Sequence, residues 1–367
     1  MNRPTHGGNL AWAAALAGCS PSFILDFSAS INPLGPPKSA IAAIEAQLKN
    51  LVAYPNPNYQ RLREALNQLH PDLTPDWILP GNGSAELLTW AGRELSQLQE
   101  TSLVTPAFSD YRRALKAFEA NVREYPLLNP ETGRWADNQL PDSLLSYGRS
   151  AVLPYRASNR GLLLNNPHNP TGQLFERETI LPLLEQFALV VVDEAFMDFL
   201  PPEQQQSLIS VVQEYENLVI LRSLTKFYSL PGLRLGYCIA HPARLRRWQQ
   251  WRDPWSVNTL AEAAAIAVVQ DTEFQQKTLN WLTAARSHLF EGLASMPGLQ
   301  PNISAANFLL VQSEQSSSQL QEKLLKHSQI LIRDCLSFPE LGDRFFRVAV
   351  RTQADNQRLL EGLAAIL

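Results

Sequence analysis

The sequence predicts an α/β protein in which a large domain, built on a mainly parallel sheet covered by helices, is followed by a small α/β domain. The chain has 367 residues, which is more than a single core usually accommodates. Short, almost continuously apolar runs alternate with helical patterns through its middle, as is typical of parallel strands buried on both faces. From about residue 244 the pattern changes to long helices followed by short strands, which indicates a second unit.

We divide the chain into three regions. Residues 1–38 are expected to form an N-terminal arm that packs on the small domain. Residues 39–243 are expected to form the large domain, and residues 244–367 the small C-terminal domain.

The large domain begins with a helical pattern over residues 39–52, and a second helix starts after the glycine turn of "GNGS". Its strands are predicted at the apolar runs, which are residues 101–106, 161–167, 187–196 and 217–223. In the small domain two long helices precede three short strands, "NFLLVQ", "QILIRD" and "RFFRVAV". The four helices expected there are residues 257–270, 274–295, 317–327 and 353–366.

Composition excludes several classes of function. The chain is 45% hydrophobic and 18% charged, its formal net charge is −4, and it has no block of lysine and arginine that would bind nucleic acid. No run approaches the ~18 apolar residues of a membrane span. Cys19, Cys238 and Cys335 lack metal-ligand spacing, and their odd number argues against a disulfide framework. We therefore expect a cytoplasmic protein without a metal site.

Polar residues follow the predicted strands and are the first candidates for a site. They are Asn165, Asn169, Asp193, Ser223 and Lys226. Because ligands of parallel sheets bind at the carboxyl ends of the strands, we expect these side chains to lie together. Each has an ordinary interpretation by itself: Asp193 could cap a helix, and Lys226 could be a charge on a surface loop.

Taken jointly, the groups match the needs of an aldehyde cofactor such as pyridoxal phosphate. Such a cofactor needs one lysine that bonds covalently to the aldehyde and a carboxylate that keeps the ring nitrogen protonated. It also needs donors for its phosphate, which a helix start, hydroxyl groups and an arginine supply. "GNGS" opens a helix, and Arg234 lies eight residues after Lys226.

The motifs "NPHNPTG", "VDEAF" and "SLTKFYSLPGLRLGY" resemble those of the fold-type I pyridoxal-phosphate enzymes, the aspartate aminotransferase superfamily. This resemblance implies that Lys226 bonds to the cofactor, that Asp193 pairs with its ring nitrogen and that Asn169 bonds to its ring hydroxyl. It implies that Phe108 stacks on the ring, and that Tyr54 reaches the cofactor phosphate of a neighbouring subunit in a homodimer. The residues implied to hold the phosphate are Gly83, Ser84, Ala85, Ser223 and Arg234.

Within that superfamily the N-terminus resembles the threonine-phosphate decarboxylases, which make the aminopropanol phosphate linker of cobalamin. The similar segments are "HGGN" at residues 6–9 and "LDFSASINPLGPP", together with Phe196 in "DEAF". Ser30 departs from the pattern, since that family usually has asparagine there. The histidinol-phosphate aminotransferases share the other motifs and are the alternative, and a non-catalytic pyridoxal-phosphate-binding protein is a third interpretation.

The expected reaction is decarboxylation of L-threonine O-3-phosphate to (R)-1-amino-2-propanol O-phosphate. Phosphothreonine has two anionic ends, so its pocket needs fixed cations. The resemblance implies that the substrate is bound by His6, Gly7, Ser30, Asn169, Arg333 and Arg347, with Arg351 a weaker candidate. Lys226 is expected to return a proton to the substrate Cα after carbon dioxide leaves.

Overall fold

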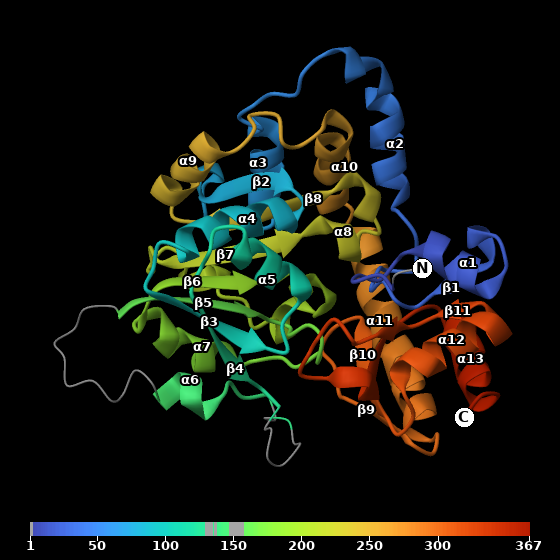
Figure 1. Ribbon diagram of the computed structural model, residues 1–367. Helices are drawn as coiled ribbons and strands as arrows, with labels where there is room; N and C mark the ends of the chain where they lie inside the picture. The colour runs from blue at the N-terminus through green and yellow to red at the C-terminus, as the bar shows by residue number, and fades with distance from the viewer. Residues whose placement is uncertain (1–2, 129–134, 136–137, 147–157) are drawn as a thin grey trace.

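The structure of the chain is a computed structural model, which describes residues 3–128, 135, 138–146 and 158–367 (Figure 1). A seven-stranded sheet forms the centre of the larger unit, in the order β2-β8-β7-β6-β5-β3-β4. In that order the strands are Ile78–Asn82, Leu235–Ala240, Leu218–Ser223, Phe187–Asp193, Ser158–Asn165, Glu100–Thr105 and Val122–Pro126. The five strands from β7 to β4 are parallel, whereas β8 is antiparallel to both β7 and β2.

Helices cover both faces of this sheet, which is why its strands are apolar on both sides. On one face α4 (Ser84–Leu95), α5 (Ser109–Lys116) and α9 (Pro242–Trp251) pack in one cluster, with Trp248 among the buried residues. The other face packs against α3 (Gln60–Asn67), α7 (Arg177–Leu184) and their neighbours in the largest core cluster. Two short helices, α6 (Asp142–Ser146) and α8 (Leu224–Phe227), complete this unit.

Two helices that the sequence pattern assigned to the small domain lie on the larger unit. α9 packs on β2, and the alanine-rich α10 (Thr259–Val269) packs on α2 (Lys38–Gln47) and α3. Both helices therefore contact elements that precede residue 243, where we expected the large domain to end. Helical periodicity gives the buried face of a helix and does not give its partner.

The small domain follows the long helix α11 (Thr272–Ala294). Its antiparallel sheet has the order β12-β13-β10-β9, and the strands are Arg333–Asp334, Phe345–Ala349, Phe308–Ser313 and Leu299–Pro301. α11 packs on α13 (Gln353–Ala364) and on β9, while α12 (Ser317–Ser328) packs on β12 and α13.

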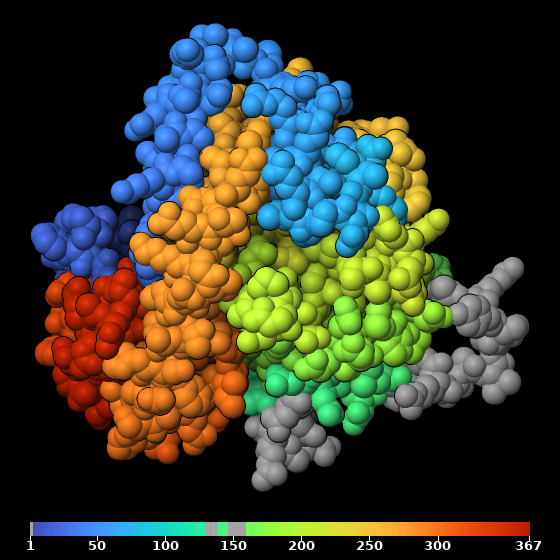
Figure 2. Space-filling view, turned by 180° about the vertical axis from the view of Figure 1, so that it is seen from behind, coloured from blue at the N-terminus to red at the C-terminus, as the bar shows by residue number. Residues whose placement is uncertain are grey.

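The N-terminal arm lies on this small domain. Its helix α1 (Leu10–Ala17) packs on α12, and β1 (Leu25–Asp26) pairs in parallel with β11 (Ile330–Leu331). Figure 2 shows the blue N-terminal residues against the red C-terminal ones at one edge of the molecule. Among the described residues, no helix combines the length and apolar character required to cross a bilayer.

Candidate active site

A cavity of about 290 Å³ lies where the carboxyl ends of β5, β6 and β7 face the arm and the small domain. It brings together many of the residues singled out from the sequence. Those that line it are His6, Gly7, Ser30, Ser84, Phe108, Asn165, Asn169, Asp193, Phe196, Lys226, Arg333 and Arg347.

Asp193 is the last residue of β6, and its carboxylate is held from two sides. One oxygen accepts a hydrogen bond from the Ala195 N–H at 2.9 Å, and the other accepts one from the Tyr111 hydroxyl at 2.9 Å. Burial raises the pKa of Asp193, and the nearby Lys226 and the Tyr111 hydrogen bond oppose that rise. The carboxylate is thus fixed in position and faces the positive charge of Lys226.

Lys226 lies in α8, directly after β7, and its Nζ donates to Ser223 Oγ at 3.3 Å. The same Nζ is 5.2 Å from the centroid of the Phe196 ring. Burial lowers the pKa of Lys226, and Arg234 and Arg347 lower it further, against the opposing effect of Asp193. A lowered pKa raises the fraction of neutral amine, which is the form that attacks an aldehyde.

The residues expected to hold a phosphate cluster around the start of α4. Gly83 has a φ of +76°, and a Cβ atom there would lie only 2.7 Å from Nη2 of Arg234. The first N–H groups of a helix lack partners within the helix and attract anions, and here a guanidinium lies beside them. Ser84 lines the cavity, while Gly83, Ala85, Ser223 and Arg234 lie around it without lining it.

Arg347 connects the small domain to the "NPHNPTG" segment. It lies in β13 and donates to Oδ1 of Asn169, and its guanidinium carbon is 4.8 Å from the centroid of the Phe308 ring. Burial lowers the pKa of Arg347 to about 10, so the side chain still carries its charge at neutral pH. It has no carboxylate partner within the described part of the chain.

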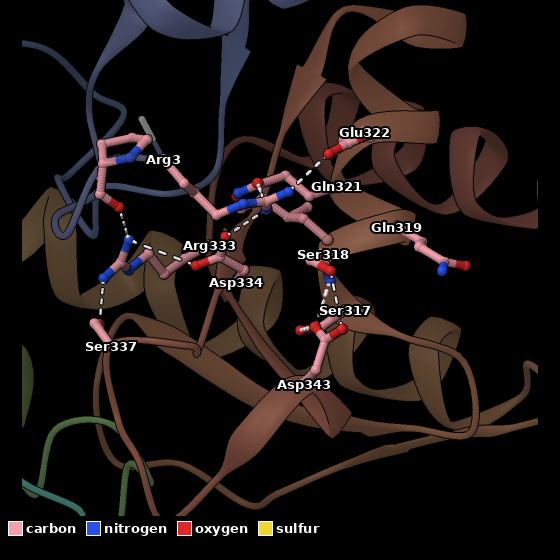
Figure 3. Close-up of polar contacts among 12 residues, drawn as sticks. Arg3, Ser317, Ser318, Gln319, Gln321, Glu322, Arg333, Asp334, Ser337 and Asp343 are labelled. Atoms are coloured by element: carbon pink, nitrogen blue, oxygen red, sulfur yellow. Dashed lines mark hydrogen bonds and ion pairs between the residues drawn. The ribbon is translucent and has the colours of Figure 1, made fainter. Parts of the chain in front are cut away.

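Arg333, in β12, reaches the same cavity from the arm side. Its guanidinium donates to Ser337 Oγ at 2.6 Å (Figure 3). It also donates to the Pro4 carbonyl at 3.3 Å and to the Thr5 carbonyl. Burial lowers the pKa of Arg333, and the neighbouring Asp334 opposes this effect. Two cationic side chains from the small domain therefore face the lysine and the carboxylate of the large sheet.

The arm supplies one wall of the cavity. The His6 ring centroid is 5.8 Å from that of Phe108, and His6 Nδ1 is 3.5 Å from Ser109 Oγ. Gly7 packs so closely that a Cβ atom there would lie 2.2 Å from the Ser28 carbonyl oxygen. Ser30 Oγ is buried and has no hydrogen-bond partner among the described residues, which leaves it available to a ligand.

Two further sequence candidates, Tyr54 and Arg351, do not line the cavity. Tyr54 is 80% exposed and stacks on Trp255, with their ring centroids 4.5 Å apart. Arg351 donates to Asp355 at 3.2 Å and to the Asp26 carbonyl at 3.2 Å, and it does not line the cavity. These contacts give Arg351 a structural role in joining the arm to α13.

Sequence reasoning missed several lining residues, of which Tyr111 is the most informative. It follows Phe108, the N-cap residue of α5, by three residues, and the centroids of the two rings are 5.7 Å apart. This spacing from Phe108 could have indicated Tyr111 from the sequence. The other lining residues that were not predicted include Ser28, Ser109, Ser337 and Phe338, and no motif distinguishes them.

The comparisons with known proteins agree with this fold. Residues 23–363 match the family described as aminotransferase class I and II. The chain belongs to this family and is a pyridoxal-phosphate-dependent enzyme of fold type I. The fold class and the cofactor expected from the sequence are thereby confirmed.

Similar proteins within this family include decarboxylases and aminotransferases of phosphate esters. The chain is 39% identical to the threonine-phosphate decarboxylase of Salmonella typhimurium, over 99% of this chain and 96% of that protein. It is 30% identical to the adenosylcobalamin biosynthesis bifunctional protein CobDQ of Leptospira interrogans, over all of this chain and 41% of that protein. A solved histidinol-phosphate aminotransferase from Clostridium acetobutylicum has a TM-score of 0.81 and 28% identity, over 94% of this chain and 99% of that one.

The residues in the cavity fit the cofactor. Gly83 leaves room for the Arg234 guanidinium beside a helix start, and Lys226 has a lowered pKa. The carboxylate of Asp193 is fixed by two donors, and Ser30 Oγ has no partner among the described residues. In the part of the chain that the structure describes, no group of three or more His, Cys, Asp or Glu side chains could hold a metal ion.

Proposed function

We propose that this enzyme decarboxylates L-threonine O-3-phosphate to (R)-1-amino-2-propanol O-phosphate, the linker of the cobalamin nucleotide loop. One observation carries the proposal: a single cavity contains Lys226 and Asp193 on one side and the guanidinium groups of Arg333 and Arg347 on the other. The similarity to a threonine-phosphate decarboxylase over nearly the whole chain supports it.

The charges of the cavity suit this substrate. Phosphothreonine carries a carboxylate and a phosphate, and each needs a fixed cation when it leaves water. Arg347 has no carboxylate partner among the described residues, and the three hydrogen bonds of Arg333 are to neutral oxygens. Both arginines are therefore able to bind anions without first breaking a close ion pair. Gly7, Ser30 and Asn169 would add hydrogen bonds or close contact to the same substrate.

The cofactor would be held by groups that the large domain positions. Lys226 would bond to its aldehyde, Asp193 would pair with its ring nitrogen, Asn169 would donate to its ring hydroxyl and Phe108 would stack on the ring. Its phosphate would be held by Gly83, Ser84, Ala85, Ser223 and Arg234. When bound, the cofactor supplies an electron-withdrawing ring that accepts the electron pair of the broken Cα bond.

The chain's own residues would decide which bond to Cα breaks. His6, Arg333 and Arg347 bind the anionic groups of the substrate and so fix its orientation. Decarboxylation requires that the carboxylate, rather than the Cα hydrogen, be presented for cleavage. After carbon dioxide leaves, Lys226 would deliver a proton to Cα, because its amine has the lowered pKa of a general acid–base group.

We also propose that the enzyme is a cytoplasmic homodimer in which Tyr54 reaches the partner's cofactor phosphate. An exposed apolar surface extends along α2 and beyond it, and its residues are Ile41, Leu48, Leu51, Val52, Tyr54 and Trp255. Exposed apolar surface of this kind is typical of a contact with another protein. The three cysteines form no disulfide, which suits a reducing compartment.

A second candidate is a histidinol-phosphate aminotransferase, because a solved enzyme of that name has nearly the same fold. Its substrate is also a phosphate ester, so the arginines alone do not separate the two reactions. Two assays do. Incubation with phosphothreonine should release carbon dioxide, whereas incubation with histidinol phosphate and 2-oxoglutarate should give no glutamate. Glutamate without carbon dioxide would replace the first proposal by the second.

A further inference from the structure

Arg3, which no motif singles out, binds the small domain through three acceptors. Its Nη1 donates to Gln321 Oε1 at 2.6 Å and to Asp334 Oδ2 at 2.7 Å, and its Nη2 donates to Glu322 Oε1 at 2.8 Å (Figure 3). The Asp334 side chain is only 3% exposed, so this ion pair is largely shielded from solvent. A forked guanidinium bound to three oxygens holds the start of the chain in one place.

The residues next to Arg3 contact Arg333 directly. The carbonyls of Pro4 and Thr5 accept hydrogen bonds from the Arg333 guanidinium, which lines the cavity. Asp334 lies between the two arginines, since its other oxygen is 3.8 Å from Arg333 Nη1. Arg3 and Arg333, which lines the cavity, therefore share the buried carboxylate of Asp334.

The far end of this segment is fixed as well. The Gly8 N–H donates to Ser28 Oγ at 2.8 Å, and Ser28 Oγ in turn donates to Asp26 Oδ1 at 2.6 Å. His6 and Gly7, between the two anchors, line the cavity, while Arg3 does not. Residues 3–8 thus form a segment attached at both ends, and only its middle faces the cavity. We call it the N-terminal strap.

We propose that Arg3 is a positioning residue for substrate binding: it fixes the N-terminal strap over the cavity and keeps Arg333 directed into it. The identity of the substrate rests on the proposed function, but the anchoring does not. If Arg3 is neutralised, Arg333 is the one cation that remains near Asp334 among the described residues, and a buried carboxylate with weakened pairing is unfavourable. Arg333 is then drawn toward Asp334, and His6 loses its attachment to the small domain.

The test compares Arg3→Gln with Arg3→Lys, which keeps the charge but not the fork, and with Arg63→Gln as a matched control. Arg63 also pairs with a carboxylate, Asp76, at 3.0 Å, and it does not line the cavity. Exchange of the amide hydrogens of residues 5–8 is followed by mass spectrometry in the cofactor-loaded enzymes. KM and kcat for phosphothreonine are measured in parallel.

We expect Arg3→Gln to exchange these amides about tenfold faster and to raise KM about tenfold, with kcat changed less than about twofold. Arg3→Lys should fall between this variant and the wild type, and Arg63→Gln should match the wild type. Unchanged amide exchange in Arg3→Gln overturns the anchoring. Faster exchange with unchanged KM overturns the effect on Arg333.

Two further measurements keep the test decisive. If Arg3→Gln folds poorly, Glu322→Gln removes only the more exposed partner of Arg3, and it should give the same two effects at smaller size. If the wild type does not act on phosphothreonine, the proposed function fails, and the dissociation constant of inorganic phosphate takes the place of KM. An unchanged phosphate affinity in Arg3→Gln would then overturn the inference.

Discussion

The Tyr111 hydroxyl donates a 2.9 Å hydrogen bond to the carboxylate of Asp193, so the carboxylate that would pair with the cofactor ring is held from the helix α5. Tyr111 is buried, and the desolvation of Asp193 beside it raises the pKa of that carboxyl. The hydrogen bond stabilises the ionised form of the carboxylate and so opposes that rise.

Tyr111→Phe should therefore raise the pKa of Asp193 further, because the change removes a donor from the ionised form. The acidic limb of the pH–rate profile should move to higher pH, and cofactor affinity should fall. Tyr125→Phe is a matched control, since Tyr125 is also buried and its hydroxyl has no partner among the described residues. A profile for Tyr111→Phe that coincides with the control would contradict this role.

Lys226→Ala should abolish turnover, with less than a few per cent of the wild-type rate remaining, because no other described lysine lines the cavity. The cofactor should also become removable by dialysis, which its visible absorbance would report. Lys323→Ala, at an exposed lysine of α12, should behave as the wild type. Substantial turnover in Lys226→Ala would defeat the assignment of the reactive amine.

Arg347→Lys should raise KM for phosphothreonine by at least about tenfold, although the charge is retained. Lysine lacks the planar guanidinium, so the hydrogen bond to Asn169 and the packing on the Phe308 ring are lost. Arg344→Lys, three residues earlier and outside the cavity, tests whether any such change in this strand region has the same effect. Equal KM values for the two variants would rule out a specific role of Arg347.

Tyr54→Ala should reduce activity strongly if the tyrosine acts across a dimer interface. Mixed with Lys226→Ala subunits at equal amounts, it should regain about a quarter of the wild-type activity, because half of the dimers are mixed and each has one intact site. Size-exclusion chromatography would verify that subunits exchange. No recovery in subunits that demonstrably exchange would contradict a shared site.

His70→Gln should make stability less sensitive to acid. Burial and Arg222 lower the pKa of His70 to about 3, below the value of about 6.5 in an unfolded chain. The unfolded state therefore binds the proton more readily between these values, and stability falls as the pH falls through that range. Between pH 7 and pH 5 the wild type should lose about 2 kcal/mol through this histidine. Urea unfolding at the two pH values measures the loss, which should be smaller in His70→Gln.

The large domain could be predicted from the sequence because its strands are buried on both faces. The run at residues 187–196 is apolar until the strand ends at Asp193, and Lys226 follows the apolar run at residues 217–223. Both polar residues do line one cavity. The reversed direction of β8 was not predictable in this way, since an apolar run carries no information about strand direction.

The contribution of the small domain and the arm was harder to predict. Arg333 and Arg347 lie on short strands, where an arginine is ordinarily a surface residue, and only the family resemblance indicated them. The contacts of Arg3 join residues more than 300 positions apart in the chain, and no local pattern encodes such a pairing. The same reasoning explains why the sequence did not indicate that α10 packs on α2 and α3.

The pairing of β1 with β11 has a consequence for biosynthesis. Residues 25 and 26 leave the ribosome long before their partners at 330 and 331 are made. The growing chain must therefore carry an unpaired strand and an uncovered apolar helix for most of its translation, a period in which such surfaces favour aggregation. A chain that ended before residue 330 would lack both the partner strand and the two arginines that line the cavity, Arg333 and Arg347.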